Sequence, residues 1–217
     1  MKSMMRTASV AALARLVGCL LMLATLTVRA QVVDRRPGEM ADEFARRVGP
    51  LGAKLAHPVL ETDEWHLRTK VVIAFYAVNS NDKDSSQEPD VADGIAFMPT
   101  AQVGRYRQVA IGRIDQEGAP PDIKSIFFAN ADHNPGRELV VIVGWEQRHR
   151  DVYGTLYGTY IYARPMTPSQ DSFVFLEDTS RKVSGGCDCD RTDEEHVISG
   201  FKTAAEVRAG LRELGFR

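Results

Sequence analysis

Oxygen-bearing side chains recur along a short polar stretch that separates two apolar runs. Four of them, Asn130, Asp132, Asn134 and Glu138, occupy relative positions 1, 3, 5 and 9. Calcium takes several oxygen ligands, and a tight loop with this spacing can supply them, so the pattern predicts weak calcium binding. A plain hairpin turn is the alternative, because the Asn-Pro-Gly run at 134–136 fixes φ at its proline and tolerates positive φ at its glycine. Turn chemistry alone accounts for these residues, and both interpretations place the stretch between two strands.

Two cysteines and one histidine form a second group. Cys187 and Cys189 are one residue apart, and His196 follows a strongly acidic run at 188–195. These three side chains could provide zinc ligands, because zinc binds thiolate and imidazole at short spacing. A disulfide between the cysteines is the favoured alternative in an oxidising compartment. Because such a bridge closes a very small ring, we expect it to be strained and readily reduced.

Aromatic side chains gather over two predicted strands and the Gly-rich connection between them. They are Trp145, Tyr153, Tyr157, Tyr160 and Tyr162. Tyrosine combines a large contact area with a polar tip, which suits a surface that binds a protein or a glycan. Strand alternation places Tyr160 and Tyr162 on one face and Tyr157 on the other, so at least one set is expected in the core. We take this region as the candidate partner-binding surface.

Catalytic signatures are sparse in the sequence. The triplet His149-Arg150-Asp151 resembles part of a protein-kinase catalytic loop, but the kinase Gly-rich loop and Asp-Phe-Gly motif do not occur. The sequence also has no Gly-x-Ser-x-Gly elbow, His-Glu-x-x-His motif or phosphate-binding loop. The chain therefore leans towards a non-catalytic role. An enzyme whose Asp or Glu side chains meet only in three dimensions stays open.

Charge argues against a nucleic-acid partner. The 217 residues contain 27 Lys and Arg against 29 Asp and Glu, and 44% are hydrophobic. Residues 1–30 hold four of the basic side chains and no acidic one, so the remainder carries a formal net charge of −6. Phosphate binding requires clustered Lys and Arg, and this acidic remainder has no basic stripe. The composition is that of an ordinary globular domain.

The first thirty residues predict a secretory signal peptide. Lys2 and Arg6 precede an apolar run of 13 residues at 16–28, and Ala30 precedes a mature start near Gln31. The run is shorter than the about 20 residues that span a bilayer, although an uncleaved anchor is an alternative. We therefore expect a periplasmic or secreted protein with no transmembrane span in the mature chain.

A lipoprotein signal is the other alternative for this segment. The run Leu16-Val17-Gly18-Cys19 matches the lipobox that bacterial lipoproteins use to acylate a cysteine. Lipoboxes normally close the apolar run, whereas this run continues beyond Cys19. Cleavage near residue 30 is therefore favoured over lipidation.

Residues 31–217 predict a single β-rich domain of the α+β class. An N-terminal helix is expected over 37–48 and a C-terminal helix after 203, where Thr203 and Glu206 form a capping box. About seven strands are expected between them, at 71–78, 94–98, 106–114, 123–129, 138–145, 155–163 and 172–176. Consecutive strands without interleaved helices favour a mainly antiparallel sheet.

The segment from Asp122 to Glu177 resembles a group of uncharacterised secreted bacterial β-rich proteins. The resemblance rests on the run at 123–132, on Glu138-Leu139 and on Gly154-Thr155-Leu156-Tyr157. The hairpin and the Tyr-rich strand are also similar to periplasmic lysozyme inhibitors and to immunity proteins against cell-wall hydrolases. The loop at 130–138 is similar to the calcium loops of FG-GAP-type repeats. These resemblances do not identify an inhibitory residue in this chain.

These resemblances imply a protein partner, with a peptidoglycan hydrolase as the implied target. The sequence thus predicts a non-catalytic exported protein that binds another protein, as an inhibitor or immunity protein. The alternative is a metal-binding or redox-active periplasmic protein centred on Cys187, Cys189 and His196. The only cofactor that the sequence suggests for the first hypothesis is calcium.

Overall fold

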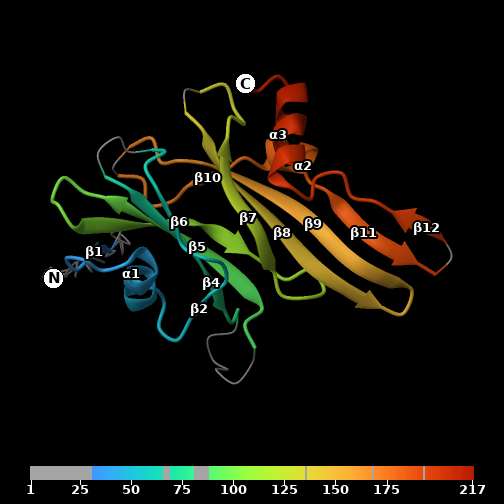
Figure 1. Cartoon of the computed structure of the whole chain (residues 1–217), viewed down its shortest axis with the longest axis horizontal. Helices are drawn as coiled ribbons and strands as arrows, with labels where there is room; N and C mark the ends of the chain where they lie inside the picture. Colours follow the sequence, from blue (N-terminus) through green and yellow to red (C-terminus); the bar gives the residue numbers. More distant parts are fainter. Residues whose placement is uncertain (1–30, 66–68, 81–87, 135, 168, 193) are drawn as a thin grey trace, which may run out of the picture.

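The computed structural model describes residues 31–65, 69–80, 88–134, 136–167, 169–192 and 194–217 (Figure 1). Within these ranges the chain forms two antiparallel sheets of six strands each and three short helices. The α+β class with mainly antiparallel strands is therefore confirmed. The predicted signal peptide, Cys19 and Pro135 lie outside the described residues. Among the helices that the structure describes, none has the length and apolar character needed to cross a membrane.

The first sheet contains the strands of the N-terminal half. Its order is β1 (Val32–Asp34), β6 (Arg105–Ile114), β5 (Val91–Pro99), β4 (Val71–Val78) and β2 (Lys54–Leu55), with β3 (Leu60–Thr62) also paired to β4. The second sheet has the order β12 (Glu194–Val197), β11 (Gly186–Arg191), β9 (Val152–Ala163), β8 (Glu138–His149) and β7 (Asp122–Ala129), with β10 (Val174–Phe175) also paired to β9.

The two sheets pack face to face, and helices cover their outer faces. Ile73 and Phe75 of β4 meet Leu139 and Val141 of β8 in the core between the sheets. Helix α1 (Ala41–Val48) covers the first sheet, where the ring of Phe44 is buried.

The outer face of the second sheet is covered by two further helices. Val207 and Leu211 of α3 (Ala204–Glu213) pack on Val140 and Ile142 of β8. Helix α2 (Glu177–Lys182) lies along β9. The layers are therefore helix, sheet, sheet and helices. Burial on both faces explains why β4 and β8 are continuous apolar runs rather than alternating ones.

Residues 158–161 at the edge of β9 pair with neither β10 nor β11. Serine side chains accept hydrogen bonds from the backbone of this segment. The backbone N–H of Ile161 donates to the Ser180 hydroxyl at 3.0 Å, and that of Thr159 donates to the Ser184 hydroxyl at 3.0 Å. The Ile161 carbonyl accepts from the Leu176 N–H at 2.8 Å. Buried backbone groups need such partners, so this segment substitutes for a neighbouring strand.

The main strands agree with the sequence prediction, and the short polar ones were missed. The predicted strand at 172–176 is reduced to β10, because Phe173 instead donates its backbone N–H to the Ala110 carbonyl on β6. The strands β1, β2, β3, β11 and β12 and helix α2 were not predicted. Strand β11 reads Gly-Cys-Asp-Cys-Asp-Arg, and glycine and aspartate have low β propensity.

The N-terminal helix is shorter than predicted, and β6 contains a bulge. Helix α1 begins at Ala41, because Glu43 accepts the backbone N–H of Met40 and so fixes the helix start.

The bulge in β6 lies at Ile111, because Ala110 and Gly112 pair with the consecutive residues Ile95 and Gly94 of β5. This shift turns Ile114 rather than Arg113 into the core.

The serine contacts of β9 make a stability prediction. Ser180 is buried, and the change Ser180→Ala leaves the Ile161 N–H without its acceptor. We expect a loss of about 1–3 kcal/mol in the free energy of unfolding, measured by denaturant titration. The control is Ser169→Ala at an exposed serine, for which we expect almost no change. Equal losses in the two variants would contradict this account of the β9 edge.

Candidate functional site

Three strands of the second sheet align a set of polar side chains on one face. Tyr153 of β9 lies between Arg148 of β8 and Asp190 of β11. In the next row on the same face, Thr155 lies between Glu146 and Asp188. Alternation places these side chains on the outer face, together with Tyr157 further along β9. We call the surface made by Glu146, Arg148, Tyr153, Tyr157, Asp188, Asp190, His196 and Lys202 the polar face.

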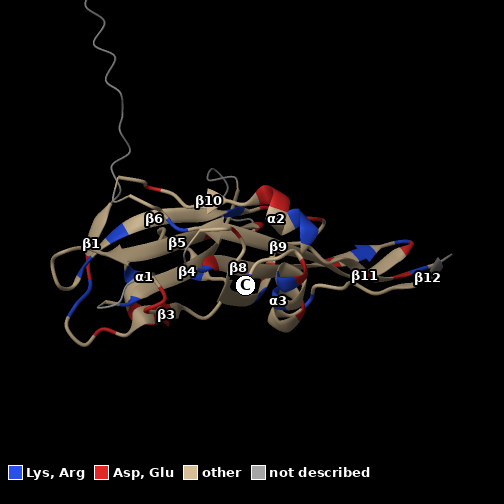
Figure 2. Ribbon diagram, turned by 90° about the horizontal axis from the view of Figure 1, so that it is seen from above, with Lys and Arg blue, Asp and Glu red and all other residues tan. Residues whose placement is uncertain are grey.

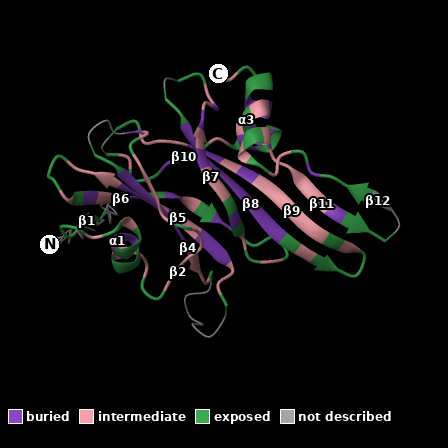
Figure 3. Cartoon of the chain, in the orientation of Figure 1, coloured by how far each residue is buried: buried purple, intermediate pink, exposed green. Residues whose placement is uncertain are grey.

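The polar face lies where the second sheet extends past the rest of the molecule. The β11–β12 hairpin projects away from the first sheet (Figures 1 and 2). Exposed residues gather at the ends of β8 and β9 beside this hairpin (Figure 3). The strands that form the buried core therefore also carry an accessible surface at their far ends.

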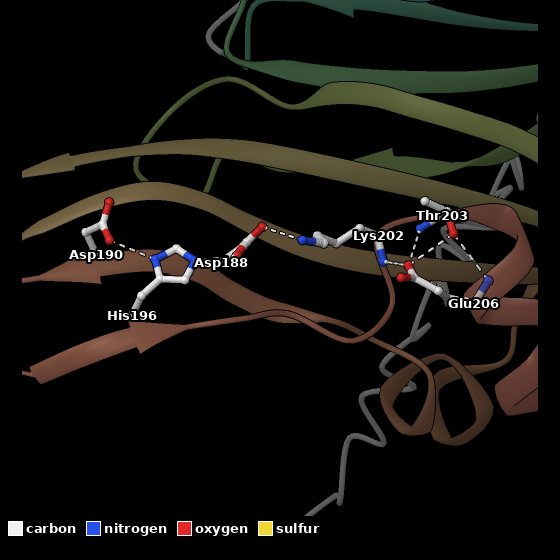
Figure 4. A network of polar contacts seen from close by, with 6 residues as sticks. All are labelled: Asp188, Asp190, His196, Lys202, Thr203 and Glu206. Atoms are coloured by element: carbon white, nitrogen blue, oxygen red, sulfur yellow. Dashed lines mark hydrogen bonds and ion pairs between the residues drawn. The ribbon is translucent and has the colours of Figure 1, made fainter.

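Four charged side chains on the polar face form a chain of contacts (Figure 4). The His196 ring contacts Asp190 through Nδ1 at 2.8 Å and Asp188 through Nε2 at 3.1 Å. The second oxygen of Asp188 accepts from Lys202 Nζ at 2.7 Å. Asp188 is thus held between an imidazole on β12 and an ammonium group in front of α3.

The start of α3 fixes the backbone of Lys202. The carboxylate of Glu206 accepts the backbone N–H of Lys202 at 2.8 Å and that of Thr203 at 2.9 Å, and the Thr203 hydroxyl accepts the N–H of Glu206 (Figure 4). This is the capping box that the sequence predicted. These contacts lower the pKa of Glu206. The capping box therefore anchors one end of the polar face to the folded body.

Contacts within this network favour the charged forms of His196, Asp188 and Lys202. The hydrogen bond to Asp190 is the largest cause that raises the pKa of His196, and Asp188 adds to it. The hydrogen bond from Lys202 lowers the pKa of Asp188, and the same contact raises the pKa of Lys202. All of these groups are in contact with solvent, so each pair contributes modestly to stability. Their main effect is to hold the side chains in defined positions.

Tyr153 is the exposed aromatic side chain of the polar face, whereas Tyr157 is half-buried. Its exposed fraction is 60%, and the guanidinium of Arg148 lies over its ring, 5.9 Å from the centroid. Arg148 also donates to Glu146 at 2.6 Å. Gly154 is required beside it, because a Cβ there would collide with the backbone carbonyl of Asp188. The glycine thus permits the close pairing of β9 with β11 that places Tyr153 next to Asp190.

The predicted aromatic surface divides between two faces of the second sheet. Trp145 and Tyr162 each have an exposed fraction of 3%, and Trp145 Nε1 donates to the Asp115 carbonyl at 3.0 Å. Tyr160 is half-buried and stacks on Tyr162 with a centroid distance of 6.4 Å. These three residues belong to the core between the sheets, which corrects their assignment to a partner-binding surface. Among the predicted aromatic residues, Tyr153 and Tyr157 are the two that lie on the polar face.

The two cysteines form a disulfide, in agreement with the favoured sequence interpretation. Cys187 and Cys189 are joined, with their Cα atoms 5.3 Å apart. Alternation along β11 turns them to the face opposite Asp188 and Asp190, whereas His196 lies with the aspartates. The structure therefore does not bring the three predicted zinc ligands together. Within the described ranges, no group of three or more His, Cys, Asp or Glu side chains could hold a metal ion. A redox role for the disulfide stays a prediction.

The predicted calcium loop connects β7 and β8, as the turn chemistry required. Asp132 accepts hydrogen bonds from the backbone and the side-chain amide of Asn134, at 2.7 and 2.8 Å. Glu138 is buried and accepts the Ala131 N–H at 2.7 Å. Burial raises the pKa of Glu138, and the nearby Asp132 adds to this shift. The Asn130 amide donates to the Arg217 carbonyl.

The carboxylates of this loop are engaged in local hydrogen bonds. Calcium takes about 6–8 oxygen ligands. The loop offers two carboxylates, Asp132 and Glu138, and both already accept hydrogen bonds from their own loop. Calcium binding at Asn130, Asp132, Asn134 and Glu138 stays a prediction that these contacts do not favour.

Sequence reasoning missed the network of Asp188, Asp190, His196 and Lys202 as a unit. The repeat Cys-Asp-Cys-Asp has a period of two, which would place both aspartates on one face of a strand. Nothing in the sequence indicates that Lys202, twelve residues beyond Asp190, returns to the same face. That contact depends on the path of the chain between β12 and α3.

Comparison of the chain with protein-family models, with curated proteins and with solved structures found no match in any of the three. The polar face is therefore interpreted from its own geometry.

The contacts of His196 predict how its imidazole titrates. We expect a His196 pKa above 6.5 in the folded chain, measured by NMR, and a lower value in the variant Asp190→Asn. Because the folded-state pKa is raised, this contribution to stability is fully present below the unfolded pKa and is lost as pH rises through the folded value. The matched control is Asp178→Asn, which removes an exposed carboxylate that pairs with Arg181 on α2. An unchanged His196 midpoint in Asp190→Asn would exclude this arrangement.

The contacts of the β7–β8 loop predict its response to calcium. We expect the same melting temperature with calcium chloride as with a chelator, measured by circular dichroism, because the loop carboxylates are already hydrogen-bonded. A rise in melting temperature with calcium that is absent from Asp132→Asn would show instead that the loop binds the ion.

Proposed function

We propose that this chain is a non-catalytic exported protein that binds a protein partner through the polar face. The observation that carries the proposal is the exposed Tyr153, held between Arg148 and Asp190 on paired strands. Tyrosine and arginine are enriched at the centres of protein interfaces, where a few residues provide most of the binding energy. The disulfide between Cys187 and Cys189 supports export, because such bonds persist in oxidising compartments.

Preorganisation favours the polar face as a binding surface. Tyr153 and Asp190 stand on strands rather than on a loop, and the salt bridges of Arg148 and Lys202 limit the freedom of their neighbours. Side chains already held in place lose less entropy when a partner binds. Both signs of charge occur along the face, with Arg148 beside Glu146 and Lys202 beside Asp188, and this pattern favours one orientation of a partner.

The narrower proposal is that the partner is a peptidoglycan hydrolase. Its support is the resemblance of the hairpin at 123–145 and of the Tyr-rich strand that follows it to lysozyme inhibitors and immunity proteins, in which a loop plugs the cleft of a hydrolase. The β11–β12 hairpin projects from the body of this chain and could approach a concave site in the same manner (Figure 2). In this proposal the polar face contacts the rim of the cleft.

The test is capture of envelope proteins on the immobilised exported form of the chain. We expect a protein that binds saturably and whose affinity falls about tenfold or more with Tyr153→Ala, as is typical of a central interface tyrosine. Asp190→Arg is expected to weaken the same complex by reversing the charge next to Tyr153. The control is Leu51→Ala, a fully exposed apolar side chain away from the polar face.

Two outcomes of this test separate the broad proposal from the narrow one. A captured protein that digests peptidoglycan, and is inhibited by the wild-type chain but not by Tyr153→Ala, supports both. A captured protein of another class supports the polar face and ends the hydrolase proposal. Equal affinities for wild-type and Tyr153→Ala chains would place the interface elsewhere and refute the polar face.

A further inference from the structure

A hollow lined by arginines lies at the opposite end of α3 from the polar face. Its volume is about 190 Å³, and it is open to solvent between the end of α3 and the β7–β8 connection. It is lined by Phe128, Ala129, Asn130, Arg137, Arg208, Arg212, Phe216 and Arg217. Four of these eight residues are arginines, and none of the described lining residues is acidic. Such a set of side chains produces a positive potential in the hollow.

Most of this positive charge is not neutralised by partners. Arg137 is paired with Glu64, to which it donates at 2.7 Å through Nε. Arg208 donates a long hydrogen bond of 3.5 Å to the Phe128 carbonyl. Within the described part of the chain, neither Arg208, Arg212 nor Arg217 forms a salt bridge.

Carboxylates near the hollow are engaged in other contacts. Asp132 binds the backbone and amide of Asn134, and Glu138 binds the Ala131 N–H. Arg208 and Arg212 are four residues apart on α3, a spacing at which like charges destabilise a helix slightly. The described lining of the hollow therefore brings guanidinium groups together and includes no acidic side chain.

Two aromatic residues and an alanine supply the apolar part of the lining. Phe128 and Phe216 contribute to its lining, and the ring of His133 packs against Phe216 with a centroid distance of 5.2 Å. The guanidinium of Arg208 lies 4.5 Å from the centroid of Phe127, a cation–π contact that holds it at the hollow. Arginine beside an aromatic wall suits a ligand that carries both a negative group and an apolar body.

We propose that this hollow binds a small organic anion, a carboxylate or phosphate group carried on an apolar body. The guanidinium groups of Arg208, Arg212 and Arg217 hold the anionic oxygens, and the apolar lining that includes Phe216 contacts the apolar part. Planar guanidinium matches both oxyanions with paired hydrogen bonds. The end of α3 carries the negative end of the helix dipole, so binding depends on the arginine side chains rather than on the helix.

This site is independent of the protein partner proposed above. Asn130, one of the residues predicted to bind calcium, lines the same hollow. Arginines that line the same hollow as Asn130 repel a cation and attract an anion. The hollow is therefore positive, whereas the predicted calcium site would be negative.

The test is calorimetric titration of the folded full chain with three anions and one cation. The probes are inorganic phosphate, phenyl phosphate, benzoate and benzylamine. We expect saturable binding of phenyl phosphate or benzoate, weaker binding of inorganic phosphate, and none of benzylamine. Whichever of the two aromatic anions binds more tightly identifies phosphate or carboxylate as the recognised group. Affinity is expected to fall as salt concentration rises.

Two variants and a control assign the binding to the hollow. Arg212→Gln and Arg208→Gln are each expected to weaken binding about tenfold, the usual effect of losing one charge-assisted hydrogen bond. Arg181→Gln, at an exposed arginine on α2 that pairs with Asp178, is expected to leave binding unchanged. All three side chains are exposed, and circular dichroism checks that each variant is folded. Absence of saturable binding in the millimolar range, or equal affinity in all three variants, would overturn the proposal.

Discussion

Burial of β8 on both faces is the constraint on which the rest of the structure depends. Every residue from Glu138 to Trp145 is buried, so both faces of this strand must be covered. The first sheet covers one face and α3 covers the other. Each large apolar side chain buried here contributes about 1.5–3 kcal/mol, which neither sheet could obtain alone. The layered arrangement follows from this requirement, because a single sheet with one helix layer would leave half of β8 in water.

The strands of the second sheet are exposed where they extend beyond the first sheet and α3. Beyond Trp145, β8 continues as Glu146 and Arg148, which are exposed, and β9 carries the exposed Tyr153 opposite them. The sheet there is still rigid, because β8, β9 and β11 remain hydrogen-bonded to one another. The side chains on this end therefore occupy fixed positions without being buried. That combination of rigidity and exposure is what a recognition surface requires.

The sequence predicts the long strands well because their signal is local. The apolar runs at 71–78 and 138–145 and the capping box at Thr203 can be identified without any knowledge of the rest of the chain. Whether each aromatic residue is buried or exposed depends instead on long-range packing. Alternation correctly separated Tyr157 from Tyr160, but it could not say which face the first sheet would cover. Strand β11 could not be predicted from propensity, because its pairing with β9 compensates for its glycine and aspartates.

The net charge does not show how acidic and basic side chains are distributed over the molecule. Residues 31–217 carry a formal net charge of −6. The polar face nevertheless pairs acidic with basic side chains, whereas the described lining of the hollow contains four arginines and no acidic residue. Helix α3 separates them: its first turn begins beside Lys202 and the carboxylates of the polar face, and its last turn ends at the arginines of the hollow. A helix of 10 residues is about 15 Å long, which exceeds the screening length of about 8 Å in physiological salt. Each site therefore responds to its own neighbours rather than to the net charge. A partner on the hairpin and a small anion at the end of α3 can therefore be recognised independently, although one helix positions both sites.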